Sequence, residues 1–491
     1  MSGTKLLKND GWRPLVRIFL AIFLISPYLI WVLNVGVWSF PEVQDWLPAL
    51  VASVIQALFS SALAFALGFL MFSGLQWWKT GRLRKWAEIS LLFPNVLPPL
   101  FFVMSLMGLA SPIGGLPYGL VTVVMAHALL NAGLVAMALD RLIQFKIGGL
   151  AETAWVLGAR PRLFWKKVAW PYLRSDLATI YLFVFSLCFA SFSIPLMLSG
   201  QHPSSLEVAI YDSIRVDGRW DKALILALMQ MFFLLALAWS FPQSSWPQRP
   251  ARRNLGFLSW SLVRSLPFLP AGLIVLGWAQ GLSKALKAPM PVFPEGLLME
   301  ALITTAIISL ATGLLHLVLF LTVALVMPHK RLGRFLNGYM APSSTITGFG
   351  LLLVPIDGDI VNLVKLVVAI SLISFPLLYR WLGHAALSSL EKQIAIARVL
   401  GAGWWKILFE VIWPQAAPQL LTASGIAALW AAGDFALSGL LLGQGQSLPL
   451  VIDGLLSNYQ LEAAQILLLP LGALSLLAYG LFRGASKYVV G

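Results

Sequence analysis

The stretch VLGARPRLFWKKVAWP, Val156–Pro171, returns later in the chain as VLGAGWWKILFEVIWP, Val399–Pro414. At an offset of 243 residues (399 − 156), seven of the sixteen positions are identical. Each copy predicts two helices with a break between them, because Gly158 and Gly401 interrupt helix-forming sequence and a Trp-Pro pair closes the stretch. We expect the Trp-Pro pair to turn the chain back toward the membrane. The occurrence of one partly charged hairpin sequence at two places in the chain predicts an internal duplication.

The composition around these copies is that of a membrane protein. Hydrophobic residues make up 59% of the 491 residues and charged residues 11%, and the mean hydropathy is +0.83; soluble proteins carry about 25% charged residues. Apolar runs of about 20 residues predict membrane-spanning helices, since backbone groups in lipid must bond within their own segment. We predict twelve spans: 16–36, 50–73, 88–110, 118–138, 176–199, 222–242, 257–279, 299–327, 338–355, 361–379, 415–442 and 461–482.

The positive charges are distributed asymmetrically between the predicted loops. With the N-terminus placed inside the cell, cytoplasmic segments hold 27 of the 34 Lys and Arg residues and external loops hold five. This bias predicts both termini in the cytoplasm, and it explains the net charge of +14 without nucleic acid. The run at 16–36 is longer than the apolar part of a secretory signal and lacks a small-residue cleavage site, so we expect it to remain as the first span.

The polar, basic segment after the sixth span divides the chain into two halves. We predict a first six-span repeat at 1–243, a cytoplasmic linker at 244–256 and a second six-span repeat at 257–491. Both hairpins then occupy the cytoplasmic loop between the fourth and fifth span of their half. Beyond the hairpins, Ser205-Leu206 corresponds to Ser447-Leu448. The fold class expected is an all-α membrane protein built from two parallel six-helix repeats.

The hairpin sequences resemble the "EAA" loop of ABC importer permeases, which reads Glu-Ala-Ala, three residues, Gly, and then an apolar stretch ending in Pro. The resemblance implies that each loop is a coupling helix that seats on a separate ATP-binding subunit. It assigns this contact to residues of both loops: Glu152, Ala154, Gly158 and Ala159 in the first, and Ala397, Gly401 and Ala402 in the second. The second loop departs from the pattern, because Ala395 stands where the motif has Glu.

The sequence also bears on partners and substrate. No G-x-x-x-x-G-K-[ST] phosphate loop occurs, so we expect no nucleotide site, no enzymatic activity and a partner homodimer of ATP-binding cassette subunits. Short external loops imply a separate periplasmic substrate-binding protein, and the expected location is the bacterial inner membrane. Residues 185–214 resemble the fused permeases for thiamine and, secondarily, those for iron(III).

A few polar residues inside predicted spans are candidates for a substrate pathway. Asp434 is the one carboxylate well within a span, and a charge there is costly, so it indicates a role in the pathway or an interface; the alternative is a local helix cap beside the break at Gly433. Its counterpart by offset is Ser191, and Asn95 lies among prolines in the third span. The five histidines show no paired metal spacing, and no catalytic set or cofactor motif is present.

The function that fits best is a permease subunit that moves its substrate by alternating access, driven by the separate ATPase. An iron(III) permease is the alternative substrate class. An ion-coupled secondary transporter would need several carboxylates or histidines within the spans. An integral-membrane enzyme would need polar groups that converge at one membrane face.

Overall fold

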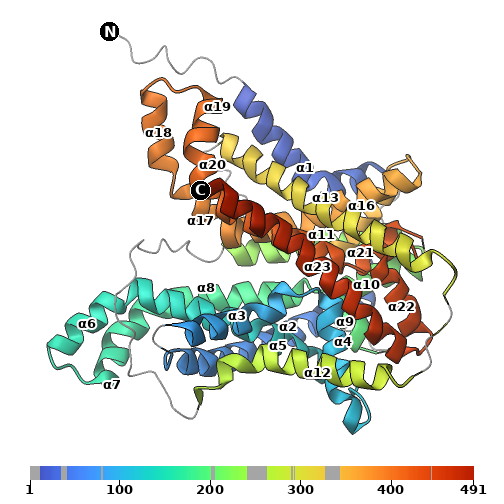
Figure 1. The fold of residues 1–491 in the computed structure, drawn as a ribbon, viewed down its shortest axis with the longest axis horizontal. Helices are drawn as coiled ribbons and strands as arrows, with labels where there is room; N and C mark the ends of the chain where they lie inside the picture. The colour runs from blue at the N-terminus through green and yellow to red at the C-terminus, as the bar shows by residue number, and fades with distance from the viewer. Residues whose placement is uncertain are drawn as a thin grey trace. The chain divides into compact units, whose positions relative to one another are not determined.

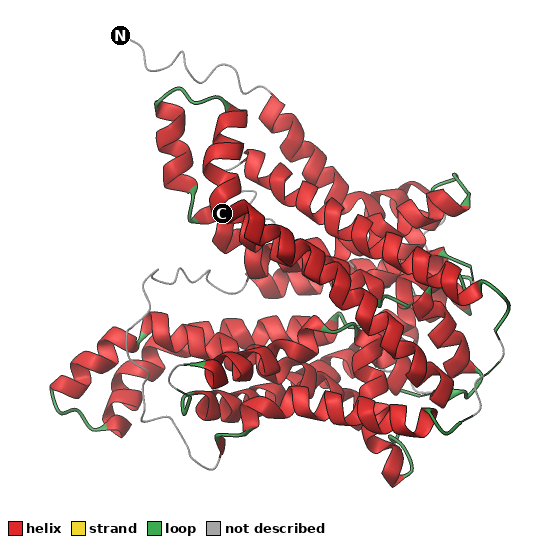
Figure 2. Cartoon of the chain, viewed as in Figure 1, coloured by secondary structure: helices red, strands yellow, loops and turns green. Residues whose placement is uncertain are grey.

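The structure is a computed structural model that describes residues 12–34, 41–78, 81–200, 205–239, 263–288, 291, 293–326, 343–443 and 445–490. Regular structure within these ranges consists of helices without strands (Figure 2), which confirms the all-α class. The predicted linker at 244–256 lies outside the described residues.

The chain separates into two compact units that do not follow the two sequence halves. Unit 1 comprises residues 1–40, 213–231 and 290–491 (Figure 1). Its helices are α1 (Trp12–Asn34), α13 (Leu297–Val326), α15 (Ser344–Leu352), α16 (Asp359–Leu378), α17 (His384–Ser388), α18 (Glu391–Val399), α19 (Trp404–Lys406), α20 (Trp413–Ala432), α21 (Ala436–Leu441), α22 (Leu448–Ser457) and α23 (Leu461–Val490).

Unit 2 comprises residues 41–212 and 232–289. Its helices are α2 (Val43–Leu75), α3 (Arg82–Val96), α4 (Pro99–Ala110), α5 (Leu120–Lys146), α6 (Gly148–Val156), α7 (Pro161–Phe164), α8 (Trp170–Phe189), α9 (Ser193–Leu198) and α12 (Leu269–Ala285). The helices α10 (Leu206–Arg215) and α11 (Trp220–Trp239) contain residues of both units.

Nine of the described helices are long and apolar enough to cross a membrane, and ten are if one bent pair counts as a single span. The bent pair is α3 and α4, whose axes differ by 105°. The break lies at Leu97 and Pro98, and both residues have extended backbone torsions. Pro98 and Pro99 each disfavour helical torsions in the residue directly before them. The third predicted span, 88–110, is therefore divided by a break among its prolines.

Two other predicted spans, the ninth and the eleventh, are not among these long helices. The ninth contains α15, which is only nine residues long. The eleventh, 415–442, is divided at Gly433 between α20 and α21, and α20 opens with prolines and glutamines that lower its hydropathy. The fifth predicted span, 176–199, divides in the same way between α8 and α9.

The duplication is visible in the order and length of the helices. The series α6, α8 and α9 begins at residues 148, 170 and 193, and the series α18, α20 and α21 begins at 391, 413 and 436. Each difference is 243 residues (391 − 148, 413 − 170, 436 − 193), and the last residues of the three pairs differ by the same number. Similar local sequence has therefore produced the same local structure twice.

The first helix of each sequence half packs within the unit built mainly from the other half. Helix α1 packs on α15 and α13: Trp31 Nε1 donates a hydrogen bond to the Ile346 carbonyl at 3.0 Å, and its buried ring lies over Gly350. Helix α12 packs on α4 and α3, where Gly108 and Gly277 let the two backbones approach closely. This exchange, together with the placement of residues 213–231 in unit 1, is how the compact units differ from the sequence halves.

The glycine contact between α4 and α12 predicts a large loss of stability when it is filled. A Cβ at Gly277 would lie 2.0 Å from the Ser105 carbonyl oxygen, so Gly277→Val is expected to separate the two helices and cost about 1–3 kcal/mol. The thermal midpoint of the purified protein, measured by size-exclusion chromatography after heating, should fall by several degrees. The matched control is Gly272→Val on the same helix, where a Cβ meets nothing within 4 Å; equal losses in both variants would refute this account of the packing.

Candidate functional site

The first hairpin begins as a near-continuous extension of a long helix. Helix α5 ends at Lys146, and the backbone bonds Ile147 N–H to Ile143 O and Ala151 N–H to Ile147 O carry the chain into α6. Helix α6 then ends at Val156, and Gly158 follows in the left-handed region at φ +70°. The amide of Ala159 donates to the carbonyl of Ala154 at 2.9 Å. This six-residue closure around a left-handed glycine is a Schellman cap.

The second hairpin closes with the same geometry. Helix α18 ends at Val399, Gly401 has φ +80°, and the amide of Ala402 donates to the carbonyl of Ala397 at 3.0 Å. The residues that the coupling-loop motif singles out thus have a common structural role in both copies. One alanine supplies the carbonyl, the glycine supplies the left-handed torsion, and the second alanine supplies the amide.

The return arm of each hairpin is one unbroken helix. In the first copy α7 leads into a π-helical segment, η2 (Trp165–Ala169), and directly into α8; in the second, α19 leads into η7 (Ile407–Ile412) and α20. The prediction that the chain turns at Trp170-Pro171 and at Trp413-Pro414 is therefore wrong. A proline has no amide hydrogen and clashes with the carbonyl four residues before it, and the wider π-turn accommodates it without ending the helix.

A continuous return arm makes each hairpin a direct extension of a long helix. In Figure 1, α6 with α7 and α18 with α19 project beyond the ends of α8 and α20.

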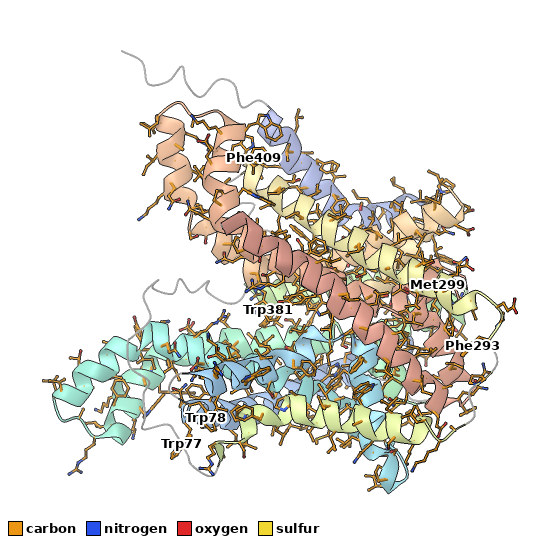
Figure 3. All side chains as sticks on the ribbon, in the orientation of Figure 1. Trp77, Trp78, Phe293, Met299, Trp381 and Phe409 are labelled. Atoms are coloured by element: carbon orange, nitrogen blue, oxygen red, sulfur yellow. The ribbon has the colours of Figure 1, made fainter. Side chains whose placement is uncertain are left out.

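The tips of both hairpins expose the same pair of apolar residues. Val156 and Leu157 are 85% and 78% exposed, and Val399 and Leu400 are 83% and 80% exposed. Both return arms expose apolar side chains as well, Leu163 at 54% in the first and Phe409, labelled in Figure 3, at 59% in the second. Adjacent large apolar side chains with this exposure are typical of an interaction surface. The tip leucines are additions to the residues that the motif assigned, and their signal was present in the matching Val-Leu of the two stretches.

The remaining motif position differs between the copies. Glu152 lies in α6, and its side chain is outside the described part of the structure. Its counterpart Ala395 is exposed on α18. The coupling role of Glu152 and of the six cap residues stays a prediction.

The three candidate pathway residues fall in different units. Asn95 and Ser191 belong to unit 2 and Asp434 to unit 1. The Asn95 side-chain amide donates to the carbonyl of Leu130 in α5. Ser191 lies in the break between α8 and α9. Their place in a pathway stays a prediction.

Asp434 has a local structural role at the break before α21. Its Oδ1 accepts hydrogen bonds from the amides of Leu437 at 2.8 Å and Ser438 at 3.4 Å, which is how an aspartate caps a helix N-terminus. Of the two interpretations that the sequence allowed, the structure shows the cap.

The cap predicts how substitutions at Asp434 behave. Asparagine caps helices as well as aspartate does, so Asp434→Asn is expected to keep the wild-type thermal midpoint, whereas Asp434→Ala should destabilise the protein by about 1 kcal/mol. Substrate uptake by the folded Asn variant then isolates the charge. Uptake close to wild type agrees with a cap alone, and a large loss of uptake in a stable Asn variant would show that transport needs the carboxylate.

Two features of the helix packing had no counterpart in the sequence predictions. Ser53 of α2 accepts a hydrogen bond from the Leu206 amide at 2.6 Å, and Thr305 of α13 accepts one from the Leu448 amide at 2.9 Å. Each half therefore anchors the start of an equivalent helix, α10 or α22, to a hydroxyl on its own long helix. The repeated Ser-Leu pairs carried part of this signal, but the hydroxyl partners could not be read from them.

A buried ion pair in unit 2 is the second such feature. Arg84 Nη2 lies 2.6 Å from Asp140 Oδ2, and Arg84 Nη1 donates to the Leu75 carbonyl at 3.0 Å. The guanidinium therefore joins the end of α2 to α3 and α5.

Comparison with known proteins identifies the class. Residues 248–487 match the family of binding-protein-dependent transport system inner membrane components. The chain is 32% identical over 240 residues to the thiamine transport system permease protein ThiP of Escherichia coli K12, a match that covers 45% of this chain and 42% of that protein. It is 24% identical over 473 residues to ThiP of Haemophilus influenzae, a match that covers 87% of each chain. No solved structure matches the chain.

The chain belongs to the inner membrane components of binding-protein-dependent transport systems. It is a two-half, multi-pass member, since the Haemophilus relative aligns along most of both proteins. Members of this family are transport subunits without a nucleotide-binding site of their own. The match to the Escherichia coli relative spans less than half of that protein's length.

Proposed function

We propose that this chain is the permease subunit of an ABC importer for thiamine. It forms the substrate pathway from two six-span repeats, twelve spans in all, with both hairpins and both chain ends on the cytoplasmic side of the bacterial inner membrane. A homodimer of ATP-binding cassette subunits grips the hairpins, and a periplasmic binding protein delivers the substrate.

The observation that carries this proposal is the pair of equivalent hairpins. Each is capped at a left-handed glycine, each exposes a Val-Leu pair at its tip, and each continues into a long helix. Two hairpins with the same shape suit a partner made of two identical subunits. Closure of that dimer on ATP would draw the hairpins together, and the helices behind them would open the pathway to the outside.

Thiamine is proposed from the relatives' function. Three of the related proteins, from Escherichia coli, Salmonella typhimurium and Haemophilus influenzae, are thiamine transport system permeases. The sequence resemblance at residues 185–214 supports the same substrate. This segment includes the break that holds Ser191, α9 and most of α10.

Reconstitution into vesicles tests this function. The chain, its ATPase and its binding protein are placed in proteoliposomes, and uptake of labelled thiamine is compared with uptake of ferric iron, with and without ATP. ATP-dependent thiamine uptake is expected. ATP-dependent uptake of iron alone would refute the substrate and keep the importer, and thiamine uptake driven by a proton gradient without the ATPase would refute the importer itself.

A further inference from the structure

An ion pair holds together the base of the first hairpin. Lys146 is the last residue of α5 and Asp176 lies in the second turn of α8, so the chain between them, 147–175, contains the first hairpin at 147–170. Lys146 Nζ is paired with Asp176 Oδ2, and the side chains are 17% and 1% exposed. The ammonium also lies 4.9 Å from the ring centroid of Tyr172 on α8, within cation–π range.

The burial of Asp176 makes this pair sensitive to the loss of either partner. A carboxylate with 1% exposure has lost nearly all of its water, and removing the Lys146 ammonium takes away an opposite charge that offsets this cost. The pair therefore opposes any separation of the end of α5 from the start of α8. These two helices are the arms through which a force on the first hairpin enters unit 2.

The second hairpin has uncharged residues at the two positions of the ion pair. At the offset of 243 residues the counterparts of Lys146 and Asp176 are Ser389 and Gln419. Ser389 donates to the carbonyl of Ala386 at 2.9 Å within its own turn, and Gln419 is exposed. Apolar residues of both arms pack in one buried cluster at this base, among them Leu387, Leu390, Ile394, Ile407, Leu408 and Ile412.

We propose that Lys146 and Asp176 are positioning residues that transmit the movement of the first hairpin to α5 and α8. The inference rests on the proposed function, since it assigns the pair a part in coupling to the ATPase. Both bases contain buried apolar residues at equivalent positions, Ile147, Ala151 and Phe164 in the first and Leu390, Ile394 and Ile407 in the second. Coupling through the first hairpin depends in addition on a charge pair. Removal of a charge at the base is therefore expected to affect the first hairpin, whose counterpart positions in the second are the uncharged Ser389 and Gln419.

The test uses charge removal and charge exchange. Lys146→Gln and Asp176→Asn each remove one partner, and the double variant Lys146→Asp with Asp176→Lys restores a pair of opposite sign. Gln393→Ala is the control, because it removes an exposed side-chain bond to Gln415 of 2.6 Å at the second hairpin. Hydrogen exchange of residues 147–170 is measured on the purified chain, and substrate moved per ATP hydrolysed is measured on the assembled importer.

Each single variant is expected to raise amide exchange in the hairpin, and to lower substrate moved per ATP, by at least about tenfold. The ATPase should still copurify, because the tips are unchanged. The exchanged pair should recover most of both losses, and Gln393→Ala should change neither. Unchanged exchange and coupling in the single variants, or loss of ATPase binding equal to the loss of coupling, would overturn the proposal. Faster exchange in the variants together with no ATP-driven uptake by the wild-type assembly would instead refute the proposed function.

Discussion

Replacing the two tip leucines by acidic residues, Leu157→Glu together with Leu400→Glu, is expected to abolish ATP-driven uptake. Each leucine is about four-fifths exposed, at 78% and 80%, so burial of each against a partner contributes about 2 kcal/mol. A carboxylate placed in an apolar groove loses that contribution and adds a desolvation cost. Since about 1.4 kcal/mol is a factor of ten, the pair should lower ATPase binding at least about 100-fold. Copurification of the ATPase and uptake in vesicles are the measurements.

Because the leucine side chains make few contacts within the chain, the double variant should fold as the wild type does. Two equally exposed positions away from the hairpins provide controls: Ile113→Glu, at 83% exposure, and Tyr459→Asp, at 94%. The aspartate suits Tyr459 because its φ is 57°, a torsion that Asp tolerates. Uptake close to wild type by the tip variant, or equal damage by the controls, would show that the tips are not the contact.

Replacing the cap glycines, Gly158→Val or Gly401→Val, is expected to uncouple ATP hydrolysis from uptake. Their φ angles are +70° and +80°, and a side chain in the left-handed region costs about 1–2 kcal/mol, more for a β-branched residue. A Cβ at either position meets nothing within 4 Å, so the whole cost comes from the backbone. The cap should open and turn the tip away, and substrate moved per ATP should fall at least about tenfold.

The backbone origin of this effect can be isolated. Asparagine tolerates left-handed torsions, so Gly158→Asn should retain much of the coupling that Gly158→Val loses. Gly403→Val changes a glycine of the second hairpin whose φ is −65° and which also has open space around it. A loss at Gly403 as large as at Gly401 would mean that any change in the loop is harmful, whatever its torsion.

The hairpins could be predicted largely because their signals are local. A glycine after a helix-forming run marks a left-handed cap, and the same run appears twice, so the breaks at Gly158 and Gly401 were expected. The path through Trp170-Pro171 was predicted wrongly. A proline in that position suits either a turn or the first turn of a helix, and only the hydrogen-bond register of the preceding residues decides between them.

The packing of α1 and α12 and the ion pair at the base of the first hairpin could not be predicted in the same way. The contact of Gly108 with Gly277 joins residues far apart in sequence, and neither glycine differs locally from others in apolar runs. Lys146 and Asp176 are separated by the whole hairpin, so each reads alone as a solvated charge. Asp434 allowed two interpretations because an aspartate beside a helix break can either cap the next helix or line a pathway, and the sequence is the same in both cases.

The most direct test of the central claim is the side of the membrane on which the two tips lie and what they touch. The chain has one cysteine, Cys188, which is buried, so Leu157→Cys and Leu400→Cys each introduce a single accessible thiol. Both should react with a membrane-impermeant maleimide in inside-out vesicles and not in intact spheroplasts, and both should crosslink to the ATPase subunit. Labelling of either thiol from the outside, or crosslinking of neither, would contradict the proposal that a separate ATPase subunit binds both hairpins.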